Sequence, residues 1–514
     1  METNTKNLIS KIPKEVSHVT DTLEKAGFEA YLVGGCVRDL LMGKEPKDWD
    51  ITTNAKPEEI VALFDKTIYE NNFGTVAVCI PTEHIVTHET SSQDVSRETP
   101  EYLIIEVTPF RLETKYSDFR HPDEVKFSDK LEDDLKRRDF TVNALSYRVK
   151  SNGHNLTDIF DGIKDIEKKV LRTVGSPDER FKEDALRMLR AIRFSIQLGF
   201  SISHETGESI LKNSDLIKKI SSERIRDEFI KIINSENPSA GVMMLQKFGL
   251  LKNIIPELEE GIGCMQSGEH VYDVWQHLLY ALQHAADKNW PLNIRLSALF
   301  HDIGKPKSRR EERRIGKKKY TFYGHEVISA RMAKKIMERL KFSGKEIELV
   351  SKLVRHHMFF SDTELITLSA VRRIITKIGK DNIWDLMNLR ECDRVGTNKK
   401  ETSYRLRKYH AMIEEALRDP ISVSQLKING EYMMKELGIK AGPRMGFILN
   451  ALLEEVLDDP SKNTVEHLSE LVQSLNMLGD GELKVLGDRG KEKKEELEEK
   501  EIAKLHQKHG IRKK

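Results

Sequence analysis

The first 150 residues alternate between two hydrophobic periodicities. Apolar positions spaced for one face of a helix predict helices over 20–26 and 57–64. Runs rich in β-branched residues predict strands at FEAYLVGG, 48–52, 75–80 and 102–110. The polar stretch 81–100 between the last two strands predicts a surface hairpin or loop. Helices and strands mixed in this way are typical of an α+β domain.

Beyond Phe181 the pattern becomes helical and stays so. Amphipathic stretches such as ALRMLRAIRF and LNIRLSALFHDI dominate, and strand-like runs are scarce. We therefore expect an α+β fold in which a mixed N-terminal domain is followed by a long, mostly α-helical region. The chain from about Gly479 onward is charged nearly throughout, which predicts a frayed helix or a flexible tail.

Composition narrows the class of protein. Hydrophobic residues make up 38% of the 514 positions and charged residues 32%, which fits a folded chain with sizeable cores. No apolar run approaches the ~18 residues that span a bilayer, and the N-terminus lacks the apolar stretch of a signal peptide, so we expect no membrane partner. The cysteines form no CxxC pair, which favours reduced thiols and a cytoplasmic location. The net charge of +1 neither requires nor excludes a nucleic-acid partner.

The first candidate site begins at a glycine turn. The run LVGGCVRD places Gly34 and Gly35 between a predicted strand and a predicted helix. Glycine lets the backbone approach a ligand closely, and the amides at the start of a helix bind anions. Arg38 follows one turn later and is a candidate phosphate ligand. A plain strand-to-helix turn is the alternative.

Two carboxylates follow the glycine turn. Asp48 and Asp50 share one face if they lie on a strand, where like charges raise one another's pKa unless a cation intervenes. Oxygen-only ligands suit Mg²⁺, which takes substrate phosphates as further ligands. A solvent-facing pair at a strand end is the alternative. Glu106, in the apolar run LIIEVTPFR, is either a third metal-facing group or a carboxylate at a sheet edge.

A third segment completes a pattern. Arg137, Arg138 and Asp139 precede an apolar run that Asn143 interrupts. Paired arginines suit triphosphate binding, and a capped, charged helix start is the alternative. The runs GGCVRDLLMG, DWDITT and RRDFTVNAL, in this order, resemble class II tRNA nucleotidyltransferases and bacterial poly(A) polymerases, which belong to the polymerase-β-like nucleotidyltransferase superfamily.

The resemblance implies a mixed-sheet catalytic head that uses two Mg²⁺ ions. Such ions can activate an attacking 3′-hydroxyl and stabilise the pyrophosphate leaving group. Phosphoryl transfer needs little beyond in-line positioning and charge neutralisation. The resemblance implies Asp48 and Asp50 as metal ligands, and Gly35, Arg38 and Arg138 as triphosphate ligands. Glu106 remains a candidate third catalytic acid from its place in the apolar run.

The run FKEDALRMLRAIRFSIQLGF is amphipathic, and an ordinary surface helix with its arginines in solvent is one interpretation. In the other, Asp184 and Arg187 are neighbours at i and i+3 that offer one acceptor and one donor edge. Cytosine and adenine both complement such a pair, whereas uracil and guanine leave polar groups unpaired at about 1–3 kcal/mol each. EDALRMLRAIRF also resembles the family's nucleotide-selecting motif, which implies nucleotide contacts for Asp184, Arg187, Arg190 and Arg193.

A histidine-aspartate series follows in the helical region. Adjacent His301 and Asp302 come after the apolar run LSALF, so two potential ligands are buried together. Imidazole with carboxylate suits Mn²⁺, Fe²⁺, Ni²⁺ or Zn²⁺. The series resembles an HD phosphohydrolase domain, which implies metal-dependent hydrolysis of phosphoesters such as 2′,3′-cyclic phosphates, or else a catalytically silent support. It implies the ligands His277, His301, Asp302 and Asp393, with His325 and His357 (or His356) for a second metal. The intervening basic run KPKSRREERRIGKKKY predicts a solvated loop, with contact to a phosphate backbone as the alternative.

The segment LKINGEYMMKELGIKAGPRMGFILNALLEEVLDDPSKN resembles the C-terminal helical part of bacterial CCA-adding enzymes. The resemblance implies template-independent addition of C, C and A to a tRNA 3′ end from CTP and ATP. Poly(A) polymerase, a partial CC- or A-adding enzyme, and an HD phosphohydrolase with an RNA-binding head are the alternatives. Departures from the family pattern are the insertion at 81–100, His121 in place of an arginine, and the charged tail. The expected domains are a catalytic head (1–150), a nucleotide-selecting and RNA-binding neck (151–260), an HD domain (261–395), a tRNA-binding region (396–478) and a flexible tail (479–514).

Overall fold

The computed structural model describes residues 11–69, 74–88, 97–113, 125–149, 156–266, 271–314, 317–358, 367–395, 404–418 and 423–510. The chain packs as two units, Met1–Arg355 and His356–Lys514. This division falls inside the predicted HD domain, and the boundaries of the five predicted domains stay predictions. His121, where the sequence departs from the family pattern, lies outside the described residues.

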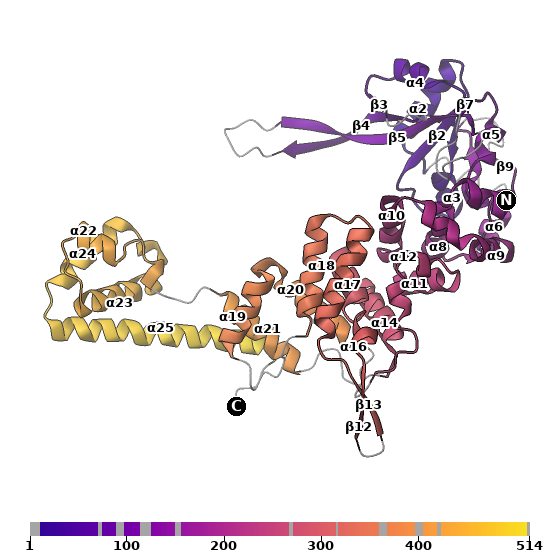
Figure 1. Cartoon of the computed structure of the whole chain (residues 1–514). Helices are drawn as coiled ribbons and strands as arrows, with labels where there is room; N and C mark the ends of the chain where they lie inside the picture. The colour runs from indigo at the N-terminus through magenta and orange to yellow at the C-terminus, as the bar shows by residue number, and fades with distance from the viewer. Residues whose placement is uncertain are drawn as a thin grey trace. The chain divides into compact units, whose positions relative to one another are not determined.

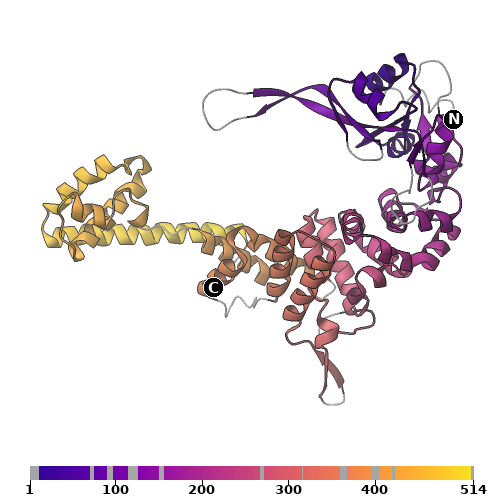
Figure 2. The same cartoon turned by 45° about the horizontal axis from the view of Figure 1, so that its top comes forward.

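A seven-stranded mixed sheet lies in the N-terminal part of the first unit (Figure 1). Its strand order is β3-β4-β5-β2-β1-β8-β9. Only β2 and β5 pair in parallel, and the other neighbours are antiparallel. The strands are β1 (Ala30–Val33), β2 (Trp49–Thr53), β3 (Thr67–Tyr69), β4 (Val76–His88), β5 (Arg97–Pro109), β8 (Leu145–Tyr147) and β9 (Leu156–Asp158). Of the stretch 81–100, predicted as a hairpin or loop, the described residues 81–88 and 97–100 continue β4 and β5. The two strands extend away from α2 (Lys14–Lys25) and α4 (Pro57–Leu63) in both views (Figures 1 and 2).

One face of this sheet packs against three helices. Trp49 and Ile51 of β2 join the buried cluster that these helices cover, together with Val19 of α2 and Val37 of α3. Because side chains alternate along a strand, Asp50 points to the opposite face. The helices and short elements of this part are α2 (Lys14–Lys25), α3 (Gly35–Leu41), α4 (Pro57–Leu63), β6 (Arg111–Glu113), β7 (Val125–Phe127), α5 (Leu131–Lys136), η1 (Thr141–Asn143) and α6 (Gly162–Lys168).

Helices dominate from residue 177 onward, as the sequence predicts. Short strands interrupt them, and the predicted loop after Lys305 is instead an antiparallel hairpin of β12 and β13. The elements to the end of the first unit are β10 (Val170–Leu171), α7 (Pro177–Glu183), α8 (Leu186–Leu198), β11 (Ser201–Ile202), α9 (His204–Asn213), η2 (Ser214–Lys219), α10 (Ser222–Ile233), α11 (Pro238–Lys247), α12 (Leu251–Ile254), α13 (Pro256–Glu259), α14 (Val274–Asp287), α15 (Leu292–Phe300), α16 (Lys305–Ser308), β12 (Arg310–Arg314), β13 (Lys317–Thr321), α17 (His325–Arg339) and α18 (Gly344–His356, which reaches into the second unit). The α+β prediction is confirmed.

The second unit is helical throughout its described part. Its elements are α19 (Leu368–Ile378), η3 (Lys380–Asn382), α20 (Ile383–Asp393), α21 (Tyr404–Leu417), η4 (Val423–Gln425), α22 (Gly430–Lys435), α23 (Pro443–Asp458), η5 (Pro460–Lys462), α24 (Val465–Asn476) and α25 (Asp480–Lys508). Of the two alternatives for the charged tail, the structure has the helix: α25 lies along α23 (Figure 2). Among the described residues, no helix is long and apolar enough to cross a membrane.

Glycines let α23 and α25 approach closely. A Cβ at Gly490 would collide with the carbonyl oxygen of Asn450 and lie 2.7 Å from its carbonyl carbon. Gly446, within α23, has open space around the same position. Ordinarily Gly→Ala in a helix stabilises by about 0.5–1 kcal/mol, and we expect this for Gly446→Ala. Gly490→Ala should instead destabilise by about 1–3 kcal/mol, since the helices must separate. Urea unfolding of the two variants checks this, and equal stabilisation by both would contradict the packing of α25.

Candidate functional site

The glycine turn between β1 and α3 lies beside the second aspartate of the DWD run. Gly34 has a φ of 82°, which L side chains rarely adopt. A Cβ there would stand 2.9 Å from Nη1 of Arg138 and 3.7 Å from Oδ2 of Asp50. The sequence singled out Gly35, which begins α3, for triphosphate binding. The structure adds Gly34 as the position where a side chain would collide with Arg138.

Asp48 and Asp50 lie just before and within β2, with Asp48 exposed and Asp50 half-buried. Burial raises the pKa of Asp50, the guanidinium of Arg138 opposes this, and the charge of Asp48 raises the pKa further. The two carboxylates therefore interact, as the spacing predicts. Carboxylate oxygens that repel one another near a surface suit a hard cation such as Mg²⁺, so the residues present fit that ion.

Glu106 is exposed and is the register partner of Asp50 across the parallel β2–β5 pair. Register partners on neighbouring strands present their side chains to the same face. The alternative of a carboxylate at a sheet edge is wrong, because β5 is paired on both sides. Its role as a third metal-facing group stays a prediction.

Two arginines after α5 share one buried carboxylate. Nη2 of Arg137 lies 2.6 Å from Oδ1 of Asp134, and Nη2 of Arg138 lies 3.1 Å from its Oδ2. Burial opposes ionisation of Asp134, but the two guanidinium groups outweigh it and lower its pKa. The alternative of a charged helix start is wrong, because α5 ends at Lys136. Asp134 thus orients Arg138 beside the glycine turn.

A chain of charge-assisted hydrogen bonds links the glycine turn to α8. Nη1 of Arg38 donates to Oδ1 of Asn143 at 2.6 Å, and Nδ2 of Asn143 donates to Oδ1 of Asp139 at 3.2 Å. Nε of Arg190 donates to Oδ2 of Asp139 at 2.7 Å. Burial alone would raise the pKa of Asp139, but the charge of Arg190 and the bond from Asn143 outweigh it and lower the pKa to about 2. Asp139 is therefore a fixed anion between two candidate phosphate ligands.

This pKa shift predicts a pH dependence of stability. Because the pKa of Asp139 is about 2 in the folded chain and ~3.9 when unfolded, its contribution is fully present above pH ~4 and is lost as the pH falls toward 2. The shift corresponds to about 2 kcal/mol. Asp139→Asn should remove that component, whereas Glu132→Gln, at an exposed position, should not. Urea unfolding between pH 2.5 and about 6 measures the difference; parallel curves for wild type and Asp139→Asn would refute the assignment.

The segment expected to read a base is two helices, not one. Asp184 follows the end of α7 in extended conformation, and α8 begins at Leu186. Oδ2 of Asp184 lies 2.7 Å from Nη2 of Arg224 on α10, a residue that the sequence did not single out. Nη1 of Arg187 lies 2.6 Å from Oε2 of Glu183. Asp184 and Arg187 are thus each oriented by a different partner. The carboxylate of Asp184 keeps a lone pair, and the guanidinium of Arg187 keeps N–H groups, that can bind a ligand.

Two of the three arginines of α8 are buried and Arg190 is half-buried, so the interpretation of a surface helix with its arginines in solvent is wrong. Arg187 and Arg193 are both 8% exposed. Arg193 pairs with Glu228 at 3.2 Å. The ring of Phe194 has Arg38, Arg190 and Arg193 at 5.6, 5.2 and 4.2 Å from its centroid. The ring attracts the three cationic groups and so offsets part of the repulsion between them. Only tertiary contact reveals Phe194, because its position in the sequence is that of an ordinary helix residue.

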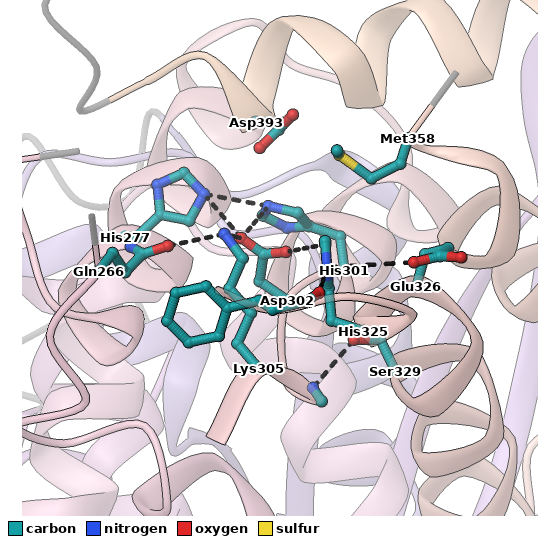
Figure 3. A network of polar contacts seen from close by, with 12 residues as sticks. Gln266, His277, His301, Asp302, Lys305, His325, Glu326, Ser329, Met358 and Asp393 are labelled. Carbon is teal, nitrogen blue, oxygen red and sulfur yellow. Dashed lines mark hydrogen bonds and ion pairs between the residues drawn. The ribbon is translucent and has the colours of Figure 1, made fainter. Parts of the chain in front are cut away.

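The histidine-aspartate series converges within the first unit (Figure 3). Nε2 of His277 and Nε2 of His301 lie 3.4 and 3.3 Å from Oδ2 of Asp302, and Nε2 of His325 lies 3.2 Å from its Oδ1. Nζ of Lys305 is 2.5 Å from Oδ2. Burial alone would raise the pKa of Asp302, but Lys305 and His301 outweigh it and hold the pKa well below its usual range.

Backbone carbonyls orient two of these imidazoles. Nδ1 of His301 donates to the carbonyl of Ala298 at 2.8 Å, and Nδ1 of His325 donates to that of Phe322 at 2.7 Å. Because Nδ1 carries the proton, Nε2 carries the lone pair that can bind a metal. Metal-binding histidines usually donate such a hydrogen bond from their other ring nitrogen. The donor set therefore fits Mn²⁺, Fe²⁺, Ni²⁺ or Zn²⁺.

The other two predicted ligands belong to the second unit. Asp393 is a buried residue at the end of α20, next to Arg390. His357 is fully buried and His356 half-buried, which favours His357 of the two. Their membership of the ligand set stays a prediction.

Three family models match consecutive parts of the chain. The "Poly A polymerase head domain" matches residues 30–172, the "Probable RNA and SrmB- binding site of polymerase A" matches 199–262, and the "HD domain" matches 268–401. Together they cover more than half of the chain. The head match contains the glycine turn, both aspartates and Arg138, and the HD match contains all the histidines of the buried cluster.

Curated proteins and solved structures give the same picture. The CCA-adding enzyme of Ligilactobacillus salivarius is 44% identical over 245 residues, which is 47% of this chain and 54% of that protein. That of Lactobacillus helveticus is 46% identical over 215 residues, 42% and 48% of the two chains. The chain thus spans about half the length of the curated relatives it matches.

The solved structures share the fold over a longer range. The Bacillus stearothermophilus CCA-adding enzyme in complex with CTP has a TM-score of 0.56 at 24% identity, covering 90% of this chain and 97% of that one. The Thermotoga maritima CCA-adding enzyme complexed with tRNA has a TM-score of 0.51 at 18% identity, covering 92% and 98%. The chain therefore carries, in this order, a poly(A) polymerase head, an RNA-binding segment of the polymerase A type and an HD domain.

Proposed function

We propose that the protein adds C, C and A to the 3′ end of tRNA from CTP and ATP without a nucleic-acid template. The observation that carries this proposal is the position of Asp50 beside both the glycine turn and Arg138. A triphosphate and a metal-binding carboxylate can meet there. The names of the relatives, all CCA-adding enzymes, support the choice of product.

Each group has a distinct task in this reaction. Mg²⁺ held by Asp48, Asp50 and Glu106 would supply activation of the 3′-hydroxyl and charge neutralisation at the leaving pyrophosphate. Arg138, oriented by Asp134, binds the triphosphate together with Arg38 and the backbone of the glycine turn. Fixed guanidinium groups cost little reorganisation as charge develops on the phosphates.

Asp184 and Arg187 select the base. Their carboxylate and guanidinium complement the amine and ring nitrogen of cytosine or adenine, while Arg190 and Arg193 contribute phosphate contacts. The contacts to Arg224 and Glu183 hold the two side chains before a nucleotide enters. The helical neck and the second unit, including 396–478, bind tRNA by shape and phosphates. The four buried free cysteines agree with a reducing, cytoplasmic location.

Incubation of tRNA lacking its terminus with labelled CTP, ATP or both tests the proposal. Addition of C, C and A that then stops supports it. A long A tail would mean poly(A) polymerase, and incorporation that stops after two C or adds only A would mean a partial enzyme.

A second activity is proposed for the HD cluster: metal-dependent hydrolysis of phosphoesters, for example 2′,3′-cyclic phosphates. The convergence of His277, His301 and Asp302 on one buried point supports it. The test is hydrolysis of a 2′,3′-cyclic nucleotide with added Mn²⁺ or Ni²⁺ by wild type and His301→Ala. His204→Ala, at an exposed position outside the cluster, is the matched control. Absence of hydrolysis by wild type with every metal would leave the HD domain as a support.

A further inference from the structure

A strongly basic hairpin lies in the sequence between two residues of the HD cluster, Asp302 and His325. Residues 305–321, which we call the basic hairpin, contain nine Lys and Arg and two Glu, a net charge of +7. The whole chain carries only +1, so the other 497 residues together carry −6. At the base of the hairpin, Lys305 pairs with Asp302, and Lys307 pairs with Glu260 at 3.3 Å.

Two register pairs of the hairpin set like charges opposite one another, while Glu312 lies opposite Lys319. Arg313 is the register partner of Lys318, and Arg314 is the register partner of Lys317. Like charges directly opposite on antiparallel strands destabilise the pair. A hairpin that only closed a loop between two helices would be more stable with neutral or opposite charges there. A bound polyanion removes this repulsion and gains free energy from the release of its own counterions.

The hairpin is also anchored at the HD cluster. Its two strands follow α16, which comes soon after Asp302, and precede α17, which begins at His325. Nε2 of His325 lies 3.2 Å from Oδ1 of Asp302. At its base the guanidinium of Arg309 lies 3.8 Å from the ring centroid of Tyr320, which ties the two strands together. Both cartoon views show β12 and β13 projecting away from α14 and α17 (Figures 1 and 2). The strands therefore stand where a large ligand can reach them.

We propose that the basic hairpin binds the phosphate backbone of RNA. This inference rests on the proposed tRNA substrate and adds a contact that neither the catalytic head nor the family matches assign. RNA is favoured over a membrane because residues 309–319 contain one apolar residue, Ile315, so little could insert into a bilayer. RNA is also favoured over an acidic protein. The phosphates of RNA are evenly spaced, so they can contact the cations of the two strands without a binding surface of specific shape.

The test compares two variants of the full chain with equal charge changes. In the tip variant, Arg313, Arg314, Lys317 and Lys318 are replaced by glutamine. In the control variant, glutamine replaces four exposed lysines of the head, Lys11, Lys14, Lys25 and Lys56. The affinity for tRNA lacking its terminus is measured by fluorescence anisotropy over a series of salt concentrations. Thermal melting without RNA checks folding.

We expect the tip variant to bind about tenfold or more weakly at 0.1 M salt and to lose about 3 units of the log–log salt slope, since each phosphate contact contributes ~0.7–0.9. Its melting temperature should equal or exceed that of wild type, because repulsion between strands is relieved. The control should keep the wild-type slope. Equal slopes for all three proteins would overturn the inference, and so would weaker binding of the tip variant to phosphatidylserine vesicles with unchanged tRNA binding. Failure of wild type to incorporate any nucleotide would instead reject the proposed function, because binding is measured without CTP or ATP.

Discussion

Asp50→Ala is expected to reduce incorporation of CMP and AMP into tRNA at least about a thousandfold, because the loss of a metal-binding carboxylate removes several kcal/mol of transition-state stabilisation. The carboxylate of Asp50 is the half-buried group of the DWD pair and lies next to Arg138. Water cannot replace it, since a neutral ligand coordinates Mg²⁺ without offsetting the charge of the ion or of the guanidinium. Single-turnover incorporation of labelled nucleotide measures the effect.

Glu45→Ala is the matched control for this prediction. Glu45 is an exposed acid five residues before Asp50, outside β2, so its loss changes the charge by the same amount without touching the site. Both variants should melt close to wild type, because Asp50 carries a raised pKa and its charge does not stabilise the fold. Near-normal incorporation by a folded Asp50→Ala protein would reject the metal assignment for the whole head.

Asp184→Ala should leave incorporation measurable but remove the discrimination of C and A from U and G. Each mismatched polar group costs about 1–3 kcal/mol, so loss of the carboxylate is expected to lower the selectivity about 10- to 100-fold. The ratio of kcat/KM for CTP to that for UTP, measured on tRNA lacking its terminus, gives the change directly. Glu179→Ala, an exposed acid on the preceding helix α7, should leave the ratio unaltered.

Arg224 provides a second measure of the same interaction. Its Nη2 lies 2.7 Å from Oδ2 of Asp184, so Arg224→Gln should lower the selectivity less than Asp184→Ala does, while Arg224→Lys partly restores it. If Arg224 had a purely structural role, its substitution would lower the free energy of unfolding and leave the ratio of kcat/KM for CTP to that for UTP unchanged. Unchanged selectivity in both Asp184→Ala and Arg224→Gln would show that other groups read the base.

The local sequence was informative where one face of an element is buried. The apolar run before His301 predicts burial of His301 and Asp302, and both are buried in the structure. Alternation along a strand also predicts that Asp48 and Asp50 share a face. Asp50 lies on β2 but Asp48 precedes it, so the shared face stays a prediction. The run of strands and then helices likewise predicts the α+β class. These features depend on neighbours within a few residues, so periodicity alone reports them.

Partners far apart in the chain could not be found in this way. Arg38 donates to Asn143 across 105 residues, Arg190 donates to Asp139 across 51, and Arg224 donates to Asp184 across 40. None of these residues has a pattern of its own, because hydrogen-bond partners are chosen by the packing of helices and not by spacing.

The sequence by itself determined which chemistry this protein carries: acidic oxygens for a hard cation, arginines for phosphates, and imidazoles with a carboxylate for a softer metal. The tertiary structure decided how those groups are held. It gave Gly34 a φ that L side chains rarely adopt, separated α7 from α8 at Asp184, and turned a basic loop into the β12–β13 hairpin. The physical reason is that residue type fixes charge and donor capacity, whereas burial, pKa and orientation arise only when distant segments pack together.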